Sequence, residues 1–153
     1  MARNEFNSPT NPYLYALHCI GGKWKMTILH EIYTFGKIRF NRTLKVLPIS
    51  EKVLSQQLKE LIEDGLVERI VHSDTYPPTI DYVLTKAGLR LIPALDILYI
   101  WSINEMDEKK IPIDSDAFVV HKSEKYMDAL KAIMEANEFL PDAERMASSK
   151  DKY

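Results

Sequence analysis

The stretch from Leu47 to Gly65 constrains the fold most, because it specifies both ends of one helix. Ser50 is a good N-cap, Pro48 stands just outside the helix, and Gly65 ends it. Between these signals, apolar residues recur at helical spacing and predict one buried stripe, formed by Val53, Leu54, Leu58, Leu61 and Ile62. The opposite face is polar. A capped amphipathic helix of about four turns follows, and such a helix is either an ordinary surface helix or one that enters a DNA major groove.

Shorter helices are predicted on the N-terminal side of this stretch. Asn11-Pro12 supplies an N-cap followed by a proline at the first helical position, and it opens a helix that ends at Gly21-Gly22. Further helices are predicted at residues 23–33 and 41–47, with a minimal strand at 38–40 between them. The 41–47 helix, the tight connection through Pro48 and the capped helix together match a helix-turn-helix pattern.

Strand-like sequence follows Gly65. Residues 66–72 and 80–84 predict two strands, and the turn-rich segment 73–78 joins them. A β-hairpin directly after a helix-turn-helix is a wing, and the combination is more specific than either part alone. The predicted fold class is therefore mainly α with a small β-hairpin, a winged helix-turn-helix domain with N- and C-terminal dimerisation helices.

A long helix is predicted from Thr85 to about residue 105, and apolar residues cover nearly all of its sides. A helix that is apolar all round must be buried all round, and a wing domain of this size covers only one side. The other side is therefore expected to meet a second copy of the chain. The residues assigned to this dimer contact are Tyr13, Leu17, Leu95, Leu98, Tyr99 and Trp101.

Three segments are expected along the 153 residues. Residues 1–10 form a mobile N-terminal arm, and residues 11–106 form the winged helix-turn-helix domain with its long dimerisation helix. Residues 107–153 form a C-terminal extension, which is predicted to contain one helix at about 116–139 and a polar tail.

Charge is nearly balanced over the chain, with a formal net charge of −2 and a pI of about 6.1, which excludes a globally basic nucleic-acid binder. The balance is locally uneven, since residues 36–60 hold six basic and two acidic side chains, whereas residues from 91 onward hold eight basic and thirteen acidic. The positive middle coincides with the capped helix.

Cys19 is the single cysteine, so an internal disulfide is ruled out. With no signal-like or membrane-length apolar run, a cytoplasmic location and no membrane partner are expected.

Several motifs occur together in the order and spacing of a known family. They are Ile20 to Lys25 (IGGKWK), Arg39-Phe40-Asn41, Ser50 to Leu54, residues 57–61 and 63–67, Pro77-Pro78, residues 82–85 and Gly88. On these residues the chain, from about 11 to 104, resembles the HxlR family of winged-helix regulators, which are MarR-like. The resemblance implies a homodimeric transcription factor that binds a pseudo-palindromic double-stranded DNA operator. It also implies that the Ser50 helix enters the major groove, that the 73–78 wing lies near the minor groove or backbone, and that the protein acts as a repressor.

Residues for DNA contact are assigned by their position on these elements. Groove contacts are expected from the recognition-helix residues Ser50, Lys52, Ser55, Gln56, Gln57 and Lys59. Backbone and wing contacts are expected from Lys23, Lys25, Arg39, Arg42, Lys45, Thr75 and Tyr76. Glutamine can recognise adenine through two hydrogen bonds, whereas serine and lysine are less particular.

Cys19 has two interpretations. Redox-sensing members of the family carry a reactive cysteine directly before the proline that opens the first helix, and here that position is Asn11. As a sensor thiol, Cys19 would be activated by His18 or Lys23. As a small hydrophobe it would simply be buried, and this second interpretation is favoured.

A small-molecule effector is a further candidate partner, in a cavity lined by Trp24, Tyr13, Tyr99 and Trp101, although such aromatic stripes are more often plain core.

No catalytic constellation is recognisable in the sequence. The four histidines lack metal-ligand spacing, and there is neither a glycine-rich phosphate loop nor a nucleophile elbow. The chain is therefore expected to be no enzyme and to need no cofactor or metal. The alternative function is a winged-helix protein-interaction module without specific DNA binding, and the positive middle argues against it.

Overall fold

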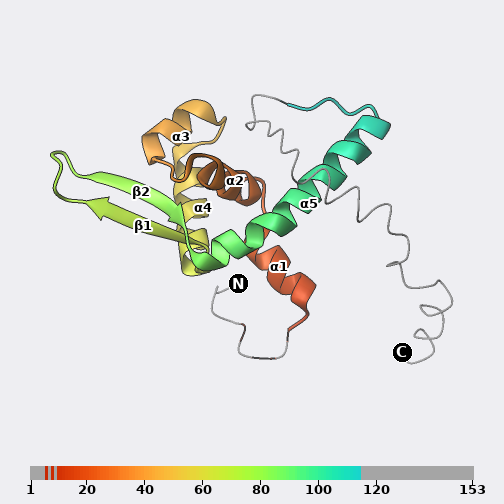
Figure 1. Cartoon of the computed structure of the whole chain (residues 1–153), viewed down its shortest axis with the longest axis horizontal. Helices are drawn as coiled ribbons and strands as arrows, with labels where there is room; N and C mark the ends of the chain where they lie inside the picture. Colours follow the sequence, from red (N-terminus) through yellow and green to blue (C-terminus); the bar gives the residue numbers. More distant parts are fainter. Residues whose placement is uncertain (1–5, 7, 9, 115–153) are drawn as a thin grey trace.

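The computed structural model describes residues 6, 8 and 10–114 (Figure 1). Its elements are α1 (Pro12–Ile20), α2 (Lys25–Phe35), α3 (Phe40–Val46), α4 (Glu51–Glu63), β1 (Val67–His72), β2 (Thr79–Leu84) and α5 (Lys86–Glu108). This order confirms the predicted winged helix-turn-helix. Most of the predicted 1–10 arm, the predicted helix at 116–139 and the polar tail lie outside the described residues.

The three N-caps expected from the sequence are present. The Asn11 side chain accepts a hydrogen bond from the backbone N–H of Tyr13 at 2.8 Å, and Ser50 Oγ accepts one from the N–H of Val53 at 3.2 Å. Thr85 Oγ1 accepts from the N–H of Gly88 at 3.1 Å. Each cap satisfies one of the donors that the first helical turn leaves without a partner. Local sequence therefore sets where α1, α4 and α5 begin.

Helix α2 begins two residues later than predicted, at Lys25 rather than Lys23. Gly22 has a φ of +102°, a backbone conformation that favours glycine. The chain turns there, and Trp24 becomes the N-cap residue. Trp24 is itself buried, so the late start places an aromatic side chain in the core.

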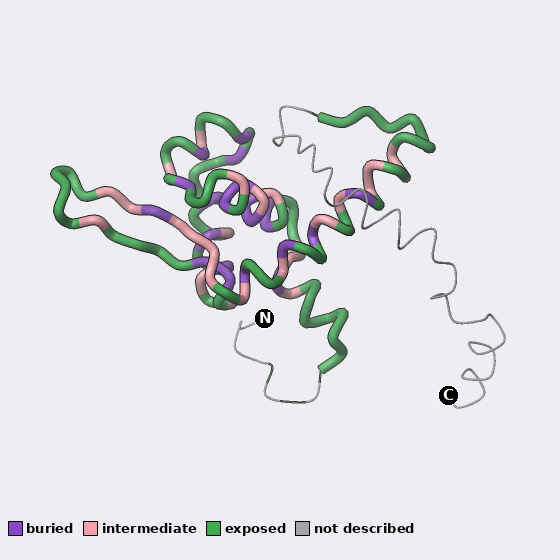
Figure 2. The backbone as a smooth tube through the Cα atoms, in the orientation of Figure 1, coloured by how far each residue is buried: buried purple, intermediate pink, exposed green. Residues whose placement is uncertain are grey.

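Most of the fully buried side chains of the core belong to α2 and α4. Ile28, Leu29 and Ile32 of α2 have no exposed surface, and the matching α4 residues are Leu54, Leu58 and Leu61. Figure 2 shows buried stretches in these two helices and also along α5 and in the connecting segments, while most of α1 and the outer part of the hairpin are exposed. The polar face of α4 is consequently held on the outside of the domain.

The wing is a two-stranded antiparallel sheet with Val67 paired to Leu84 at its base and His72 paired to Thr79 near its tip. The minimal strand predicted at 38–40 is a single bridge, in which Ile38 and Tyr82 exchange two backbone hydrogen bonds of 3.0 Å. The wing and the long α5 helix project from the domain in different directions (Figure 1). The bridge ties the base of the wing to the chain that leads into α3.

Two expectations about apolar positions are wrong. Val53, placed in the buried stripe of α4, is 39% exposed, because the buried face is narrower than the run of apolar residues. Leu95, assigned to the dimer contact, is buried in the core of its own domain together with Ile92. Helix α5 therefore has one face in the domain core and another, with Leu98 and Trp101, that is exposed in the single chain.

Among the described residues, no helix combines the length and apolarity that crossing a membrane would need.

At Gly88, α5 lies close to the backbone of Leu66, the residue before β1. A Cβ atom at this position would lie 2.3 Å from the backbone oxygen of Leu66, a contact that the fold cannot accommodate without movement. Thr85 completes the junction, since its hydroxyl donates a 2.6 Å hydrogen bond to the backbone oxygen of Gly65. The first turn of α5 is thus fixed against the turn that follows α4.

We predict that Gly88→Ala destabilises the protein by about 1–3 kcal/mol, the usual cost of forcing extra volume into a packed site. The direction of the change in stability is informative, because alanine in an unconstrained helix position would be more favourable than glycine by about 1 kcal/mol. Urea unfolding followed by circular dichroism measures the change. Arg90→Ala, at an exposed position of the same helix, is the matched control and should change stability little. A Gly88→Ala protein as stable as the control would contradict the close approach.

Candidate nucleic-acid interface

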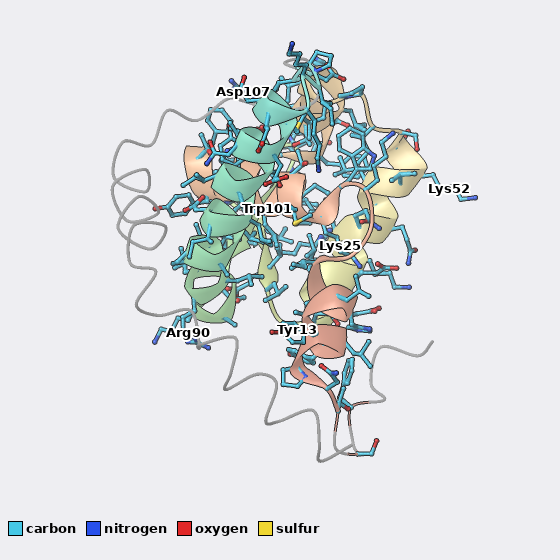
Figure 3. The ribbon with its side chains drawn as sticks, turned by 90° about the vertical axis from the view of Figure 1, so that its right-hand side faces the viewer. Tyr13, Lys25, Lys52, Arg90, Trp101 and Asp107 are labelled. Atoms are coloured by element: carbon cyan, nitrogen blue, oxygen red, sulfur yellow. The ribbon has the colours of Figure 1, made fainter. Side chains whose placement is uncertain are left out.

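The outer face of α4 is polar. It points away from the core because the opposite face of the helix is buried. Lys52, Ser55, Gln56 and Lys59 are exposed, as is the N-cap residue Ser50. Figure 3 shows Lys52 pointing away from the body of the protein. The helix is 13 residues long, which corresponds to roughly 20 Å. It therefore offers hydrogen-bond donors and acceptors over a length that fits a major groove.

Gln57 does not belong to this outer face. Its side-chain oxygen is buried, and no hydrogen-bond partner for it occurs in the described part of the chain. That oxygen lies 3.4 Å from where a Cβ atom on Gly22 would be, so the side chain faces the turn between α1 and α2. The expectation that Gln57 contacts the DNA groove is corrected accordingly, since it lies a further 100° around the helix from Gln56.

Lys25 is also placed differently from the prediction. Its side chain is only 5% exposed, and its Nζ lies 2.7 Å from Oε2 of Glu60 on α4. A buried ammonium with a carboxylate partner is not available to a phosphate. The sequence suggested a phosphate contact because Lys23 and Lys25 both stand at the start of the predicted helix, whereas the side chain of Lys25 is turned toward α4. Lys23 remains exposed, with its Nζ 5.4 Å from the centre of the Trp24 ring.

Basic side chains lie on the segment that precedes α4 in the chain. Arg42 and Lys45 on α3 are exposed, and Lys37 and Arg39 stand just before that helix with about half of their side-chain surfaces accessible. These residues are the basic members of the segment 36–60 outside α4. They lie on α3 and on the loop before it, and α3 packs against α4.

Asp81 of β2 is the centre of an ionic cluster that the sequence did not predict. Its Oδ1 accepts a 2.9 Å hydrogen bond from Arg39 Nε, and its Oδ2 lies 2.8 Å from His72 Nε2 and 3.3 Å from Lys37 Nζ. We call these four residues the wing anchor. Asp81 is the buried residue of β2, although its carboxyl group is charged. The anchor joins the wing to the segment before α3.

The surroundings of Asp81 strongly favour its ionised form. The hydrogen bond from Arg39 lowers the pKa of the carboxyl most, against the opposing effect of burial, and His72 and Lys37 lower it further. Together they bring the pKa from 3.8 to about 2. Asp81 is therefore a carboxylate at any pH near neutrality, and the anchor remains intact there.

The tip of the wing presents one aromatic residue to solvent. Tyr76 is fully exposed. Next to it, the Thr75 hydroxyl is within hydrogen-bond distance of the backbone oxygens of His72 and Pro77, at 3.2 and 3.3 Å. Thr75 thus stabilises the shape of the tip, and Tyr76 is the aromatic side chain that the tip exposes.

The surface assigned to dimer formation is exposed in the single chain. Tyr13 on α1 and Trp101 on α5 are 84% and 59% exposed, and Leu17 and Leu98 are also exposed. Tyr99 differs from these, because its ring stacks on His30 at 6.2 Å and burial raises its pKa. Among the described residues, no group of three His, Cys, Asp or Glu side chains could hold a metal ion.

Cys19 is buried and belongs to the hydrophobic core. The Tyr15 side chain hydrogen-bonds to it, and this interaction is the main cause of a raised pKa of Tyr15. One residue earlier, His18 Nε2 lies 3.2 Å from Asp64 Oδ1 at the end of α4. The burial agrees with the interpretation of Cys19 as a packed hydrophobe, because a reactive thiol needs solvent access.

The chain is similar to known transcriptional regulators. The model of the HxlR-like helix-turn-helix family matches residues 19–110. The HTH-type transcriptional regulator YtcD of Bacillus subtilis (strain 168) is 38% identical over 116 residues, which cover 75% of this chain and 87% of YtcD. Among solved structures, the reduced form of the redox regulator HypR matches with a TM-score of 0.61 and 35% identity, covering 65% of this chain and 98% of HypR. A MarR-family regulator from Enterococcus faecalis V583 matches with a TM-score of 0.57 and 31% identity, covering 70% and 97%.

The wing anchor predicts a specific dependence of stability on pH. Because the pKa of Asp81 is lower in the folded protein than in the unfolded chain, the anchor stabilises the fold fully above about pH 4. This contribution is lost as pH falls toward about 2. We expect Asp81→Asn to unfold at a lower temperature than the unmodified protein at pH 6, and the two midpoints to converge near pH 2. Thermal unfolding across this range measures the difference.

The control for this prediction is Asp74→Asn, at an exposed position on the wing. Its unfolding midpoint should follow that of the unmodified protein at every pH. A constant difference between Asp81→Asn and the unmodified protein from pH 6 to pH 2 would contradict the ionic role of the anchor.

Proposed function

Because the chain belongs to the HxlR-like helix-turn-helix family of transcriptional regulators, we propose that it binds a pseudo-palindromic DNA operator as a homodimer and represses the adjacent genes. The observation that carries this proposal is the outer face of α4. It is exposed and polar, its opposite face is locked into the core, and basic residues of α3 stand beside it. A surface of this kind combines groove recognition with attraction for phosphates.

In this proposal the exposed side chains divide into two roles. Lys52, Ser55 and Gln56 contact base edges in the major groove, with Ser50 at the start of the helix. Phosphate contacts come from the exposed basic side chains Lys23, Arg39, Arg42, Lys45 and Lys59. The tip of the wing, with Tyr76, lies against the neighbouring backbone or minor groove. The segments 11–106 and 107–153 are the DNA-binding unit and an appended extension.

The homodimer is supported by the apolar surface that the single chain leaves exposed. Tyr13 and Leu17 on α1, and Leu98 and Trp101 on α5, come from the two helices at opposite ends of the domain in sequence. Covering large aromatic surfaces of this kind is worth about 25 cal/mol per Å² of apolar area removed from water. A two-fold dimer places its recognition helices about one DNA turn, roughly 34 Å, apart.

The proposal does not include a thiol switch. HypR is described as a redox regulator. In this chain the residue before the first helical proline is Asn11, and the single thiol, Cys19, is buried in the core. A small-molecule effector remains part of the proposal as the signal that would relieve repression.

We predict different effects for a phosphate contact and a base contact. Arg42→Glu should weaken binding to all DNA and reduce the dependence of affinity on salt, because fewer counterions are released on binding. Gln56→Ala should weaken binding to the selected operator by about 1–3 kcal/mol and change binding to random DNA little. The operator is selected from random DNA with the unmodified protein, and fluorescence anisotropy at several salt concentrations measures both affinities.

Arg90→Glu is the matched control for the charge reversal. Arg90 and Lys52 lie on opposite sides of the domain (Figure 3), so this change should leave the salt dependence of DNA binding nearly unaltered. Equal losses on operator and random DNA for both Arg42→Glu and Gln56→Ala would contradict the assigned roles. If the protein selects no sequence at all, the protein-interaction module is the better interpretation.

We also predict that Trp101→Glu converts the dimer into monomers, because it places a charge in the apolar contact. Sedimentation velocity measures the molar mass in solution. Val71→Glu, at an exposed apolar position on the wing, is the matched control and should stay dimeric. An unmodified protein that sediments as a monomer, or a Trp101→Glu protein that remains dimeric, would overturn this assignment.

A further inference from the structure

We propose that the buried ion pair between Lys25 and Glu60 positions Gln56 and thereby determines which base this glutamine selects. The inference rests on the proposed DNA-binding function and adds two positioning residues to it. The observation behind it is a continuous chain of polar contacts. Lys25 Nζ lies 2.7 Å from Glu60 Oε2, and Gln56 Nε2 donates a 3.0 Å hydrogen bond to Glu60 Oε1.

The Glu60 carboxylate fixes the orientation of the Gln56 amide. An ionised carboxylate only accepts hydrogen bonds, so it can be approached by the amide NH₂ group and not by the amide oxygen. Gln56 therefore keeps its NH₂ group on the side of Glu60 and its oxygen on the other side. One N–H is used by Glu60, and the second N–H and the oxygen remain for a base edge. Adenine requires one donor and one acceptor in a fixed order, which this orientation supplies.

Lys25 in turn holds Glu60 in place. The Lys25 side chain is 5% exposed, whereas that of Glu60 is 19% exposed. Leaving a buried ammonium without its carboxylate is costly, so Glu60 is not free to swing into solvent. The two carboxylate oxygens serve different partners, Oε2 for Lys25 and Oε1 for Gln56. An exposed glutamine is thus ordered before DNA arrives, which reduces the entropy cost of binding.

The position of the pair in the fold explains why it reaches a base-contacting residue. Lys25 is the first residue of α2, and Glu60 lies one turn after Gln56 on α4. The pair therefore spans from the helix that supports α4 to the edge of its outer face. Gln57, the neighbouring amide, faces the Gly22 turn and has no contact of this kind with Glu60 among the bonds described.

The test uses Glu60→Gln, a change that preserves shape and alters only the order of donors and acceptors. The buried ammonium can bind only the oxygen of the new amide, which turns the NH₂ group of residue 60 toward Gln56. Gln56 must then present its oxygen to residue 60, and the order offered to the base reverses. We expect the preference for the base pair that depends on Gln56 to fall about tenfold or more. That base pair is identified beforehand as the one whose substitution no longer matters in Gln56→Ala.

A second variant separates positioning from a purely structural role. In Lys25→Met with Glu60→Gln there is no ammonium, so the amide oxygen of residue 60 is again available to Gln56. We expect this double variant to recover much of the base preference. If the pair only stabilises the fold, the double variant should not recover the base preference. The exchanged pair, Lys25→Glu with Glu60→Lys, keeps the opposite charges and should lose the preference, because lysine has no acceptor for Gln56.

Affinity for the selected operator and for its single-base variants is measured for each folded protein, with thermal unfolding as the check on folding. Base preference unchanged in Glu60→Gln and in the exchanged pair would overturn the inference. So would a loss in Glu60→Gln that Lys25→Met does not relieve. These outcomes differ from failure of the proposed function itself, in which the unmodified protein selects no operator and the inference falls with it.

Discussion

The packing of α2 against α4 is the contact on which the rest of the structure depends. Ile28, Leu29 and Ile32 are fully buried in the same hydrophobic cluster as the leucines of α4. Burial of each such side chain contributes about 1.5–3 kcal/mol, so the contact is far stronger than any single surface interaction. Because one face of α4 is locked in this way, its rotation about its own axis is fixed. The residues at the outer face follow from that rotation alone.

Hydrophobic packing fixes a face, but it does not orient the polar groups on it. In this structure two ionic contacts orient those polar groups. Asp81 of the wing binds Arg39 of the segment before α3, and Lys25 reaches from α2 to Glu60 on α4. Both combine one buried charge with partners that are more exposed. Such pairs add little to stability compared with apolar residues of the same volume. Their value is geometric, since they allow one arrangement of donors and acceptors and exclude the others.

Sequence patterns predicted the elements because the signals involved are local. A cap such as Ser50 acts on the next turn of chain, and the leucines of α4 need only helical periodicity to be recognised. The residues placed wrongly depend on distant partners. Lys25 resembles a surface lysine until α2 is seen to start two residues late. The ionic cluster around Asp81 was not predicted at all, because Arg39 lies 42 positions earlier in the chain. Neither partner is visible in the spacing of the residue itself.

Helix α5 shows the limit of composition as evidence. Its apolar residues cover nearly every side, which indicates burial but does not say by what. The structure divides them into Ile92 and Leu95, which complete the domain core, and Leu98 and Trp101, which the single chain leaves exposed. The division follows from Gly88, because the close approach of this residue to Leu66 sets which side of α5 faces the wing base. The same contact therefore determines the inner face of the helix and, by exclusion, the face that is available to a second copy.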